Sequence, residues 1–423
     1  MAMVKMTTQR RKALEKMPFR QNSTRCSRKE WATRLALAAI VGMICLYGVT
    51  FSLAQVLVKS DPLLAQRLAP YDGRILAAYA TSLAGEGANS KQRTQADRVA
   101  KHALRQDPTA VAAVATLGMN ADIRGDATSA RRYFGYAQKL SRRDLRVQLF
   151  MIESSVQRGD IPATLHQYDI TLRVFPRLGD LLYPVLASAI NDPEIRRGLI
   201  KTLSGKPIWG EDFVNFIAAK GVDPRSTAAL FLGLARAGFA VPDGARATMV
   251  NALIRTGETD AAWAYYTTIH PGSDRRRSRD PRFSANLTTP SQLDWTQIID
   301  GSGVTSNIQN GVFDFSAPSS VGGPLLQQFQ LLPPGTYRLT GHSSEIEQTG
   351  SIGAYWVLTC LGGRELGRVD VPNSAISNGH FSGKLTVPKG CPVQLLVLVA
   401  RPSNTVEGLS GQFDKIQLAP EPL

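Results

Sequence analysis

The stretch "LGMNADIRGDATSARRYFGYA", Leu117–Ala137, holds a tripeptide that occurs twice in the chain. Arg-Gly-Asp stands at residues 124–126 and again at 158–160, so Gly125 and Gly159 lie 34 residues apart. A fixed period of this length indicates an array in which each repeat is a pair of helices. Glycine permits the backbone of a tight turn, and aspartate caps the helix that follows. We therefore interpret both copies as the turn within a repeat and not as an adhesion motif.

The residues around the first copy suit the packing of such a helix pair. Ala130 and Ala137 are small enough for two antiparallel helices to approach closely, and Phe134 fills the space between them. One period earlier, residues 96–108 ("ADRVAKHALRQDP") end in a proline that stops the second helix. One period later, Tyr168 takes the place of Phe134.

These residues resemble the tetratricopeptide repeat (TPR) family in about three consecutive units, from roughly Asp72 to Pro176. Thr164 stands where the family has a small alanine, so the third unit departs from the pattern. After an irregular helical stretch, the segment "NALIRTGETDAAWAYYTTIHP" shows the same pattern of a helix pair, with Gly257 in the turn and Ala262 and Tyr266 in the second helix. The resemblance implies a TPR-like α-solenoid over residues 59–270, with a groove that suits a protein partner.

An uncharged apolar segment precedes this helical domain. Residues 35–58 contain 24 residues without a charge, and about 20 helical residues cross the hydrocarbon core of a bilayer. Residues 1–34 carry ten Lys and Arg against two Glu. The positive-inside rule therefore keeps this basic tail in the cytoplasm and predicts export of everything after the transmembrane helix. The layout favours a single-pass protein of a bacterial inner (cytoplasmic) membrane, with its bulk in the periplasm.

A cleaved signal peptide is the rival interpretation. Ser52-Leu53-Ala54 has small residues spaced like a signal-peptidase site. The long basic tail and the continuation of the apolar run to Val58 favour the uncleaved anchor.

The net charge of +15 is unevenly distributed, with +8 in the basic tail, +10 in residues 35–282 and −3 in residues 283–423. Topology accounts for the tail, and an exported segment has no access to nucleic acid, so we expect no nucleic-acid partner. The positive helical region instead favours an acidic protein partner. Cys360 and Cys391 are the only cysteines in the exported part, and in an oxidising compartment they are predicted to form a disulfide.

The segment 271–282, "PGSDRRRSRDPR", interrupts the helical pattern. We interpret it as a solvated, Arg-rich linker, with contact to lipid head groups or to an acidic glycan as the alternative. From residue 283 to 423 the chain breaks into short alternating runs separated by Gly, Pro, Ser and Asn. This pattern predicts an antiparallel β-sandwich of the jelly-roll type, and hence a multidomain α plus β protein.

Three segments of this region, "DWTQI", "LLQQFQLLPPGTYRLTG" and "GQFDKIQL", resemble the jelly-roll domains of carbohydrate-binding modules and are similar to galactose-binding-like sandwiches. The resemblance covers Phe283 to the end of the chain and implies glycan binding by fold analogy. Such sandwiches often carry a structural calcium ion, but no clustered Asp/Asn loop here requires one. No ligand-binding residue carries over by motif.

Strand parity nominates a glycan site. Trp356 and Leu358 are expected in the core, which turns Tyr355 outward. Arg338 and His380 are expected on outer faces as well. The three would form one patch if their strands share a sheet, and the alternative is that they are ordinary exposed sheet residues.

Few patterns in the sequence point to catalysis. The five histidines are scattered, and no nucleophile elbow, phosphate-binding loop or zinc motif occurs. Glu345 and Glu347 lie two residues apart on an expected strand, where a solvated surface explains them better than a glycosidase pair. We expect no cofactor, no metal site and no enzymatic activity. The leading hypothesis is a non-catalytic, membrane-anchored envelope scaffold with a glycan-binding sandwich, serving surface polysaccharide assembly or export. The alternatives are a pure protein–protein scaffold and, third, a glycan-modifying enzyme.

Overall fold

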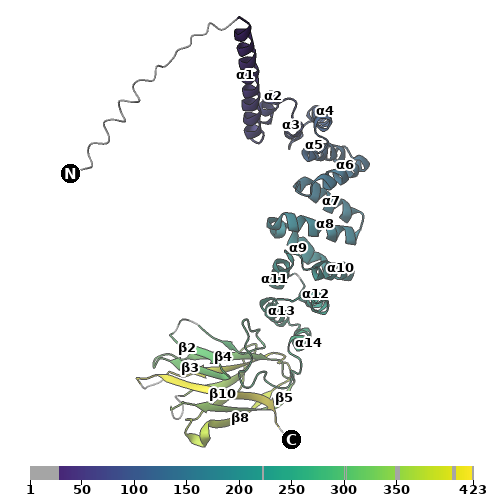
Figure 1. Cartoon of the computed structure of the whole chain (residues 1–423). Coiled ribbons are helices and arrows are strands. Elements are labelled where there is room, and N and C mark those ends of the chain that lie inside the picture. The colour runs from purple at the N-terminus through teal and green to yellow at the C-terminus, as the bar shows by residue number, and fades with distance from the viewer. Residues whose placement is uncertain are drawn as a thin grey trace, which may run out of the picture. The chain divides into compact units, whose positions relative to one another are not determined.

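A computed structural model of the chain describes residues 28–221, 223–299, 301, 303–347, 353–402 and 406–421. Most of the expected basic tail, residues 1–27, lies outside this range. The chain forms two compact units, Met1–Val147 and Gln148–Leu423. Helices fill the first unit, and the second contains both helices and strands (Figure 1).

Fourteen α-helices and two 3-10 turns occur within the described residues. They are α1 (Arg28–Leu57), α2 (Pro62–Leu68), α3 (Gly73–Leu83), α4 (Ser90–Gln106), α5 (Val111–Ile123), α6 (Ala127–Leu140), α7 (Leu145–Gln157), α8 (Ile161–Val174), η1 (Pro176–Leu178), α9 (Gly179–Ala189), α10 (Pro193–Ser204), α11 (Gly210–Lys220), α12 (Pro224–Arg236), α13 (Asp243–Arg255), α14 (Thr259–Ile269) and η3 (Ile376–Gly379). Of these helices, α1 is long and apolar enough to cross a membrane, judged by length and composition.

The two Arg-Gly-Asp copies are built in the same way. Gly125 joins α5 to α6 with a φ of +77°, and Gly159 joins α7 to α8 with a φ of +67°. The Asp126 carboxylate accepts a hydrogen bond from the Ser129 amide at 3.0 Å. The Asp160 carboxylate likewise accepts one from the Ala163 amide at 3.0 Å. Each glycine adopts a left-handed conformation that other residues resist, and each aspartate caps the next helix.

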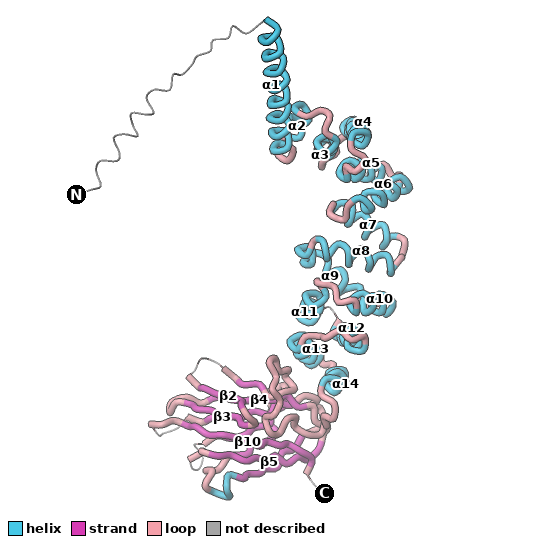
Figure 2. Tube along the Cα trace, in the orientation of Figure 1, coloured by secondary structure: helices cyan, strands magenta, loops and turns pink. Residues whose placement is uncertain are grey.

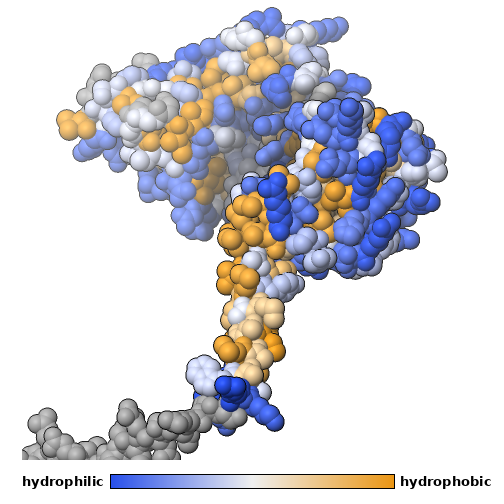
Figure 3. All heavy atoms as spheres, turned by 90° about the horizontal axis from the view of Figure 1, so that it is seen from above, coloured by the Kyte–Doolittle hydropathy of each residue, from blue (hydrophilic) through white to orange (hydrophobic). Residues whose placement is uncertain are grey.

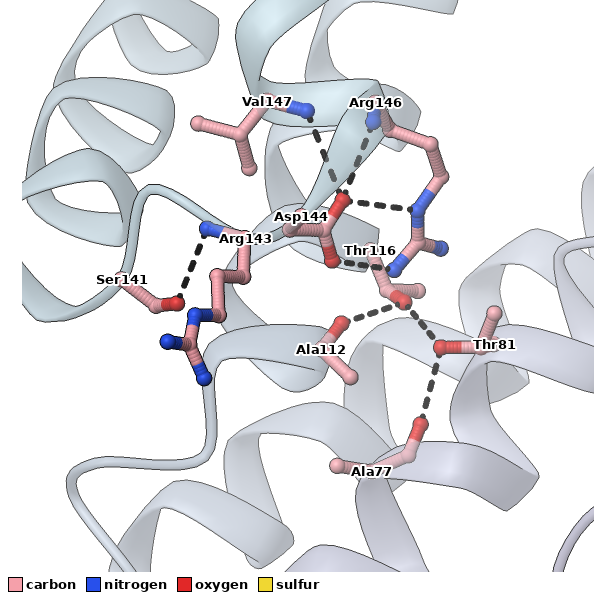
Figure 4. A network of polar contacts seen from close by, with 9 residues as sticks. All are labelled: Ala77, Thr81, Ala112, Thr116, Ser141, Arg143, Asp144, Arg146 and Val147. Atoms are coloured by element: carbon pink, nitrogen blue, oxygen red, sulfur yellow. Dashed lines mark hydrogen bonds and ion pairs between the residues drawn. The ribbon is translucent and has the colours of Figure 1, made fainter. Parts of the chain in front are cut away.

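Small residues bring the helices of the first unit together. The α6 residues Ala130 and Ala137 have no exposed surface, and Phe134 is equally buried. A Cβ atom on Gly118 of α5 would meet the Phe134 ring at 3.0 Å, so a larger residue there would require that ring to shift. Helices α3 and α5 are tied by a hydrogen bond of 3.0 Å between the hydroxyls of Thr81 and Thr116 (Figure 4). The helical character of this region is confirmed, and its membership of the TPR family stays a prediction.

The Asp144 side chain caps the N-terminal end of α7. Its carboxylate accepts hydrogen bonds from the amides of Arg146 and Val147 and forms an ion pair with the Arg146 guanidinium at 2.9 Å (Figure 4). This cap satisfies amides that the first helical turn leaves unpaired.

Among the described residues, ten strands form the C-terminal sandwich, and Figure 2 draws strands in magenta. They are β1 (Thr296–Gln297), β2 (Thr305–Gln309), β3 (Val312–Ala317), β4 (Gly323–Gln330), β5 (Gly335–Ser344), β6 (Tyr355–Cys360), β7 (Glu365–Asp370), β8 (His380–Val387), β9 (Gln394–Ala400) and β10 (Leu409–Pro420). The first sheet has the order β1-β4-β9-β6-β7, and the second has the order β2-β3-β10-β5-β8. The pairings between these strands are antiparallel, as predicted.

Aromatic side chains fill the space between the two sheets. Trp356 has no exposed surface and packs edge-to-face on Trp295 and on Phe413, with ring centroids 5.7 and 5.8 Å apart. The predicted disulfide between Cys360 and Cys391 is confirmed. It ties the end of β6 to the loop before β9, at one rim of this core.

A buried polar network joins the last helix to the sandwich. The Tyr266 hydroxyl on α14 donates to the Asp294 carboxylate at 2.6 Å, and that carboxylate also accepts bonds from the Ser291 amide and hydroxyl. The Arg279 side chain is only 6% exposed and lies 6.0 Å from the Tyr266 ring centroid. Burial lowers the pKa of the Arg279 guanidinium to about 10, so the group remains charged at neutral pH. The Asp294 carboxylate supplies the compensating charge.

The expectation of a solvated 271–282 linker is wrong at Arg279. Its guanidinium donates to the carbonyls of Leu293 and Phe329 and to the Gln330 side chain. Residues 278–281 also hydrogen-bond to β10, through the amides of Ser278 and Ile416. Arg277, by contrast, has an exposed side chain and pairs with Asp274. The segment therefore closes one end of the sandwich while exposing part of its charge.

We predict that Asp294→Ala strongly destabilises the second unit, because it removes the carboxylate that compensates the buried Arg279 guanidinium. The expected loss in the free energy of unfolding is about 3–5 kcal/mol. Urea denaturation of the detergent-solubilised chain, followed by tryptophan fluorescence, measures it.

Asp260→Ala is the matched control, because Asp260 is highly exposed and pairs with Arg275 at the surface. It is expected to lose less than about 1 kcal/mol. Equal losses in the two variants would contradict the role of Asp294.

We further predict that replacing both Cys360 and Cys391 by Ser lowers the free energy of unfolding by about 3–4 kcal/mol, since the bridge closes a loop of about 30 residues. Cys45→Ser is the control, because Cys45 is a free thiol on α1. A double variant as stable as the parent chain would show that the bridge contributes nothing.

Candidate functional site

The outer face of the first sheet carries a group of charged side chains around one aromatic ring. Trp356 and Leu358 of β6 point into the core, so Tyr355 faces outward. The guanidinium carbons of Arg368 and Arg401 lie 4.1 and 4.2 Å from the Tyr355 ring centroid. Each arginine is within the range of a cation–π contact.

Two carboxylates fix these arginines. Arg401 bonds to Asp370 at 2.7 Å and to the Gly353 carbonyl at 3.3 Å. Arg368 bonds to Glu365 at 3.0 Å, and this hydrogen bond raises the pKa of Arg368 above its ordinary value. We call the five side chains the Tyr355 cluster: Tyr355, Arg368, Arg401, Glu365 and Asp370.

Apolar side chains adjoin the cluster on the same face. Val357 of β6 lies in register with Val397 of β9 on one side and with Arg368 of β7 on the other. Val397 is flanked in turn by Gln327 of β4. Val357 is 8% exposed and Val397 is 7% exposed, although neither belongs to the sandwich core. Their neighbours on this face therefore shield them.

This arrangement combines the groups that a sugar requires. A pyranose ring has apolar faces and a hydrogen-bonding rim, so a binding site needs aromatic or aliphatic surface beside a few fixed polar groups. The Tyr355 ring supplies the first, and Gln327 with the charged members of the cluster supplies the second. The guanidinium groups would also bind a carboxylate or sulfate on the ligand through charge-assisted hydrogen bonds.

Arg338 and His380 lie on the outer face of the second sheet. Arg338 of β5 is in register with Lys384 of β8, and both pair with Glu421, at 2.6 and 3.0 Å. Hydrogen bonds from Lys384 and Arg338 lower the pKa of Glu421. His380 faces His342 across the same strand pair, with ring centroids 4.7 Å apart.

The condition for a single patch of Tyr355, Arg338 and His380, that their strands share a sheet, is therefore not met. Arg338 and His380 share the second sheet, whereas Tyr355 belongs to the first. Strand parity indicates whether a side chain points inward or outward, but a jelly roll places β5 and β6 in opposite sheets. For the same reason, the sequence did not indicate that Arg368 and Arg401 lie beside Tyr355. The position of Arg401 directly after the apolar run of β9 was the one pattern that could have suggested it, and no pattern pointed to Arg368.

A hollow of about 330 Å³ lies where the segment before β1 meets the sandwich. Asp280, Trp295 and Gln297 line it. The Asp280 carboxylate accepts hydrogen bonds from the Ser284 amide and hydroxyl and from the Ala285 amide. Because these bonds occupy the Asp280 carboxylate, it is less able to bind a ligand. The hollow is therefore a weaker candidate for a binding site than the Tyr355 cluster.

Side chains suited to binding a metal ion are not gathered in the described part of the chain. No set of three His, Cys, Asp or Glu side chains there is placed to hold a metal ion. Glu345 and Glu347 are both exposed, on either side of the buried Ile346.

No protein family and no curated protein sequence matches this chain. Among solved structures it is similar to a carbohydrate-binding module described under "CBM4 structure and function", at 14% identity over 34% of this chain and 99% of that chain, with a TM-score of 0.27. It is also similar to TmCBM61 in complex with β-1,4-galactotriose, at 15% identity over 35% of this chain and 97% of that chain, with a TM-score of 0.22. A third is a Glycosylation Associate Protein (Gap123) complex from Streptococcus agalactiae, at 11% identity over 29% of this chain and 41% of that chain, with a TM-score of 0.21. Values this low identify no ligand for the chain.

Proposed function

We propose that this protein is a non-catalytic, membrane-anchored envelope factor whose sandwich binds a polysaccharide while its TPR-like helices dock a protein partner. The observation that carries the glycan-binding part is the outer face of the first sheet. There, an aromatic ring and two hydrogen-bonded guanidinium groups lie on one surface of a jelly-roll sandwich. Glu365 and Asp370 balance the charge of the two arginines, so the proposed preference for an acidic polysaccharide rests on charge-assisted hydrogen bonds from the guanidinium groups and not on a net positive charge.

The anchor part of the proposal is supported by how α1 ends. Ala54, at the candidate signal-peptidase site, has no exposed surface and belongs to a cluster with Ala65 and Ala69 of the next segment. Phe51 packs on the same cluster. Cleavage after Ala54 would remove Phe51 and Ala54 from this contact, so the fold favours the uncleaved form. Export of the remainder agrees with the disulfide, which an oxidising compartment maintains.

The docking part is supported by a hollow of about 640 Å³ on the helical array. Its lining includes three cations, Arg173 on α8 and Arg197 and Lys201 on α10, and two carboxylates, Asp169 and Glu194. Asp169, which also lines it, is bound by Arg173 and by the Trp209 indole. The remaining positive charge suits an acidic protein surface.

The glycan-binding proposal predicts that Tyr355→Ala and Arg401→Ala each weaken binding of an acidic polysaccharide by about tenfold or more, since each removes a group at the centre of the site. Calorimetric titration of the full chain in lipid nanodiscs, against a panel of acidic and neutral polysaccharides at low and at physiological salt, measures this change.

Arg338→Ala is the matched control, because it removes an outer-face arginine from the other sheet. It should leave binding unchanged. Loss of binding in Arg338→Ala alone would move the site to the second sheet. No binding to any polysaccharide by the folded chain would contradict glycan binding and favour the alternative, a protein scaffold with a structural sandwich.

The anchor proposal predicts that the chain isolated from membranes keeps the residues before Ala54. Intact-mass measurement and N-terminal sequencing test this. A mature chain that begins at Gln55 would establish the cleaved signal peptide instead.

A further inference from the structure

Helix α2 folds back along the end of α1. Four residues, 58–61, separate the two helices, and so short a connection makes neighbouring helices antiparallel. Figure 1 shows α2 beside the C-terminal end of α1, where their buried residues form one cluster. Ala54 of α1 and Ala65 of α2 both have no exposed surface in it.

This contact fixes the depth of α2 relative to the apolar segment. Residues 35–58 would rise about 36 Å as a helix, whereas the hydrocarbon core is about 30 Å thick. The excess of about 6 Å corresponds to about four residues. With residue 35 at the opposite interface, the stretch from Gln55 to Val58, next to Ala54, therefore lies at this membrane–water interface. Because α2 packs on this stretch and runs back toward the membrane, its C-terminal end lies at the level of the lipid head groups.

The outward side of α2 is apolar at this level. Leu63 is 43% exposed, Leu64 is 40% exposed, and Tyr71, just beyond the helix, is 78% exposed. Lys59 and Arg67, which are also exposed, flank them. In Figure 3 most of the surface of α1 is hydrophobic, and α2 packs directly on the last turns of this helix.

We propose that Leu63, Leu64 and Tyr71 form an interfacial collar that inserts into the head-group region of the membrane that α1 crosses. The inference rests on the proposed membrane anchor. Tyrosine favours this depth because its apolar ring can lie among the lipids while its hydroxyl hydrogen-bonds to water. Lys59 and Arg67 reach lipid phosphates while their stems cover apolar surface. Lipid is the occupant because the collar is continuous with the lipid-facing surface of α1.

The collar determines where the helical array starts. Helix α3 begins at Gly73, two residues after Tyr71. A Cβ atom on Gly73 would come within 2.6 Å of the Asp107 side chain, so α3 is packed tightly onto the end of α4 from its first residue. The first helix pair is thereby held at the membrane surface and does not hang on a loose tether.

The test uses the full chain in nanodiscs that contain a phosphatidylcholine with a photoactivatable diazirine in its acyl chain near the head group. Mass spectrometry after irradiation is expected to find lipid attached to α1 and to the peptide that spans Leu63–Tyr71. Ile208 and Leu181 are internal controls, because they are 80% and 61% exposed but lie far from α1 in the sequence. Their peptides should stay unlabelled.

A variant with Leu63, Leu64 and Tyr71 all replaced by Ser is expected to lose labelling of the α2 peptide down to the level of the Ile208 peptide, while α1 remains labelled. The matched control carries Ser at Leu181 and Ile208 and should label like the parent chain. Labelled α1 with unlabelled α2 in the parent chain would overturn the collar and leave the anchor standing. A chain unlabelled at both would contradict the anchor itself. Cross-links from α2 to a second copy or to another protein, in place of lipid, would also overturn the collar.

Discussion

The burial of one charge, the Arg279 guanidinium, organises the second unit of this protein. Moving a guanidinium out of water costs several kcal/mol unless hydrogen bonds and a nearby opposite charge offset the loss. Here the carbonyls of Leu293 and Phe329 accept from it, and the Asp294 carboxylate balances its charge. Asp294 is in turn held by the Tyr266 hydroxyl of the last helix. The arginine can be buried only if helix, loop and sheet come together, so these parts fold as one unit.

That constraint leaves the two outer faces of the sandwich with different chemistry. The second sheet exposes polar side chains such as Arg338 and Lys384, which share the Glu421 carboxylate. The first sheet presents the Tyr355 ring with two arginines stacked on it, each paired with its own carboxylate. A surface that combines an aromatic ring with fixed guanidinium groups is the kind that binds an acidic sugar. The function that we propose follows from this asymmetry between the faces.

Local patterns carried most of the fold. The 34-residue recurrence of Gly125 and Gly159 located the turns correctly. Both glycines adopt a positive φ, which is the conformation that a tight turn requires and that glycine favours. Two cysteines in the region that we expected to be exported were enough to predict their disulfide, and alternation was enough to predict strands. The failures came from long-range pairing. A segment with five arginines is expected to be solvated. No feature of the neighbouring sequence indicates that Arg279 bonds to partners some 50 residues later in the chain. Similarly, strand alternation predicts that the side chains of Tyr355 and Arg338 both point outward. It does not predict which sheet each strand joins, because that depends on the connections of the whole sandwich.

The most direct test of the central claim is a hydrogen-exchange footprint of the full chain in nanodiscs, with and without an acidic polysaccharide. Slower amide exchange is predicted in β6, in β7 and in the residues just after β9, where the Tyr355 cluster lies, with β5 and β8 unchanged. Protection confined to β5 and β8, or to the helices, would contradict the assignment of the first sheet as the binding face. An unchanged exchange pattern at a saturating polysaccharide concentration would contradict glycan binding altogether.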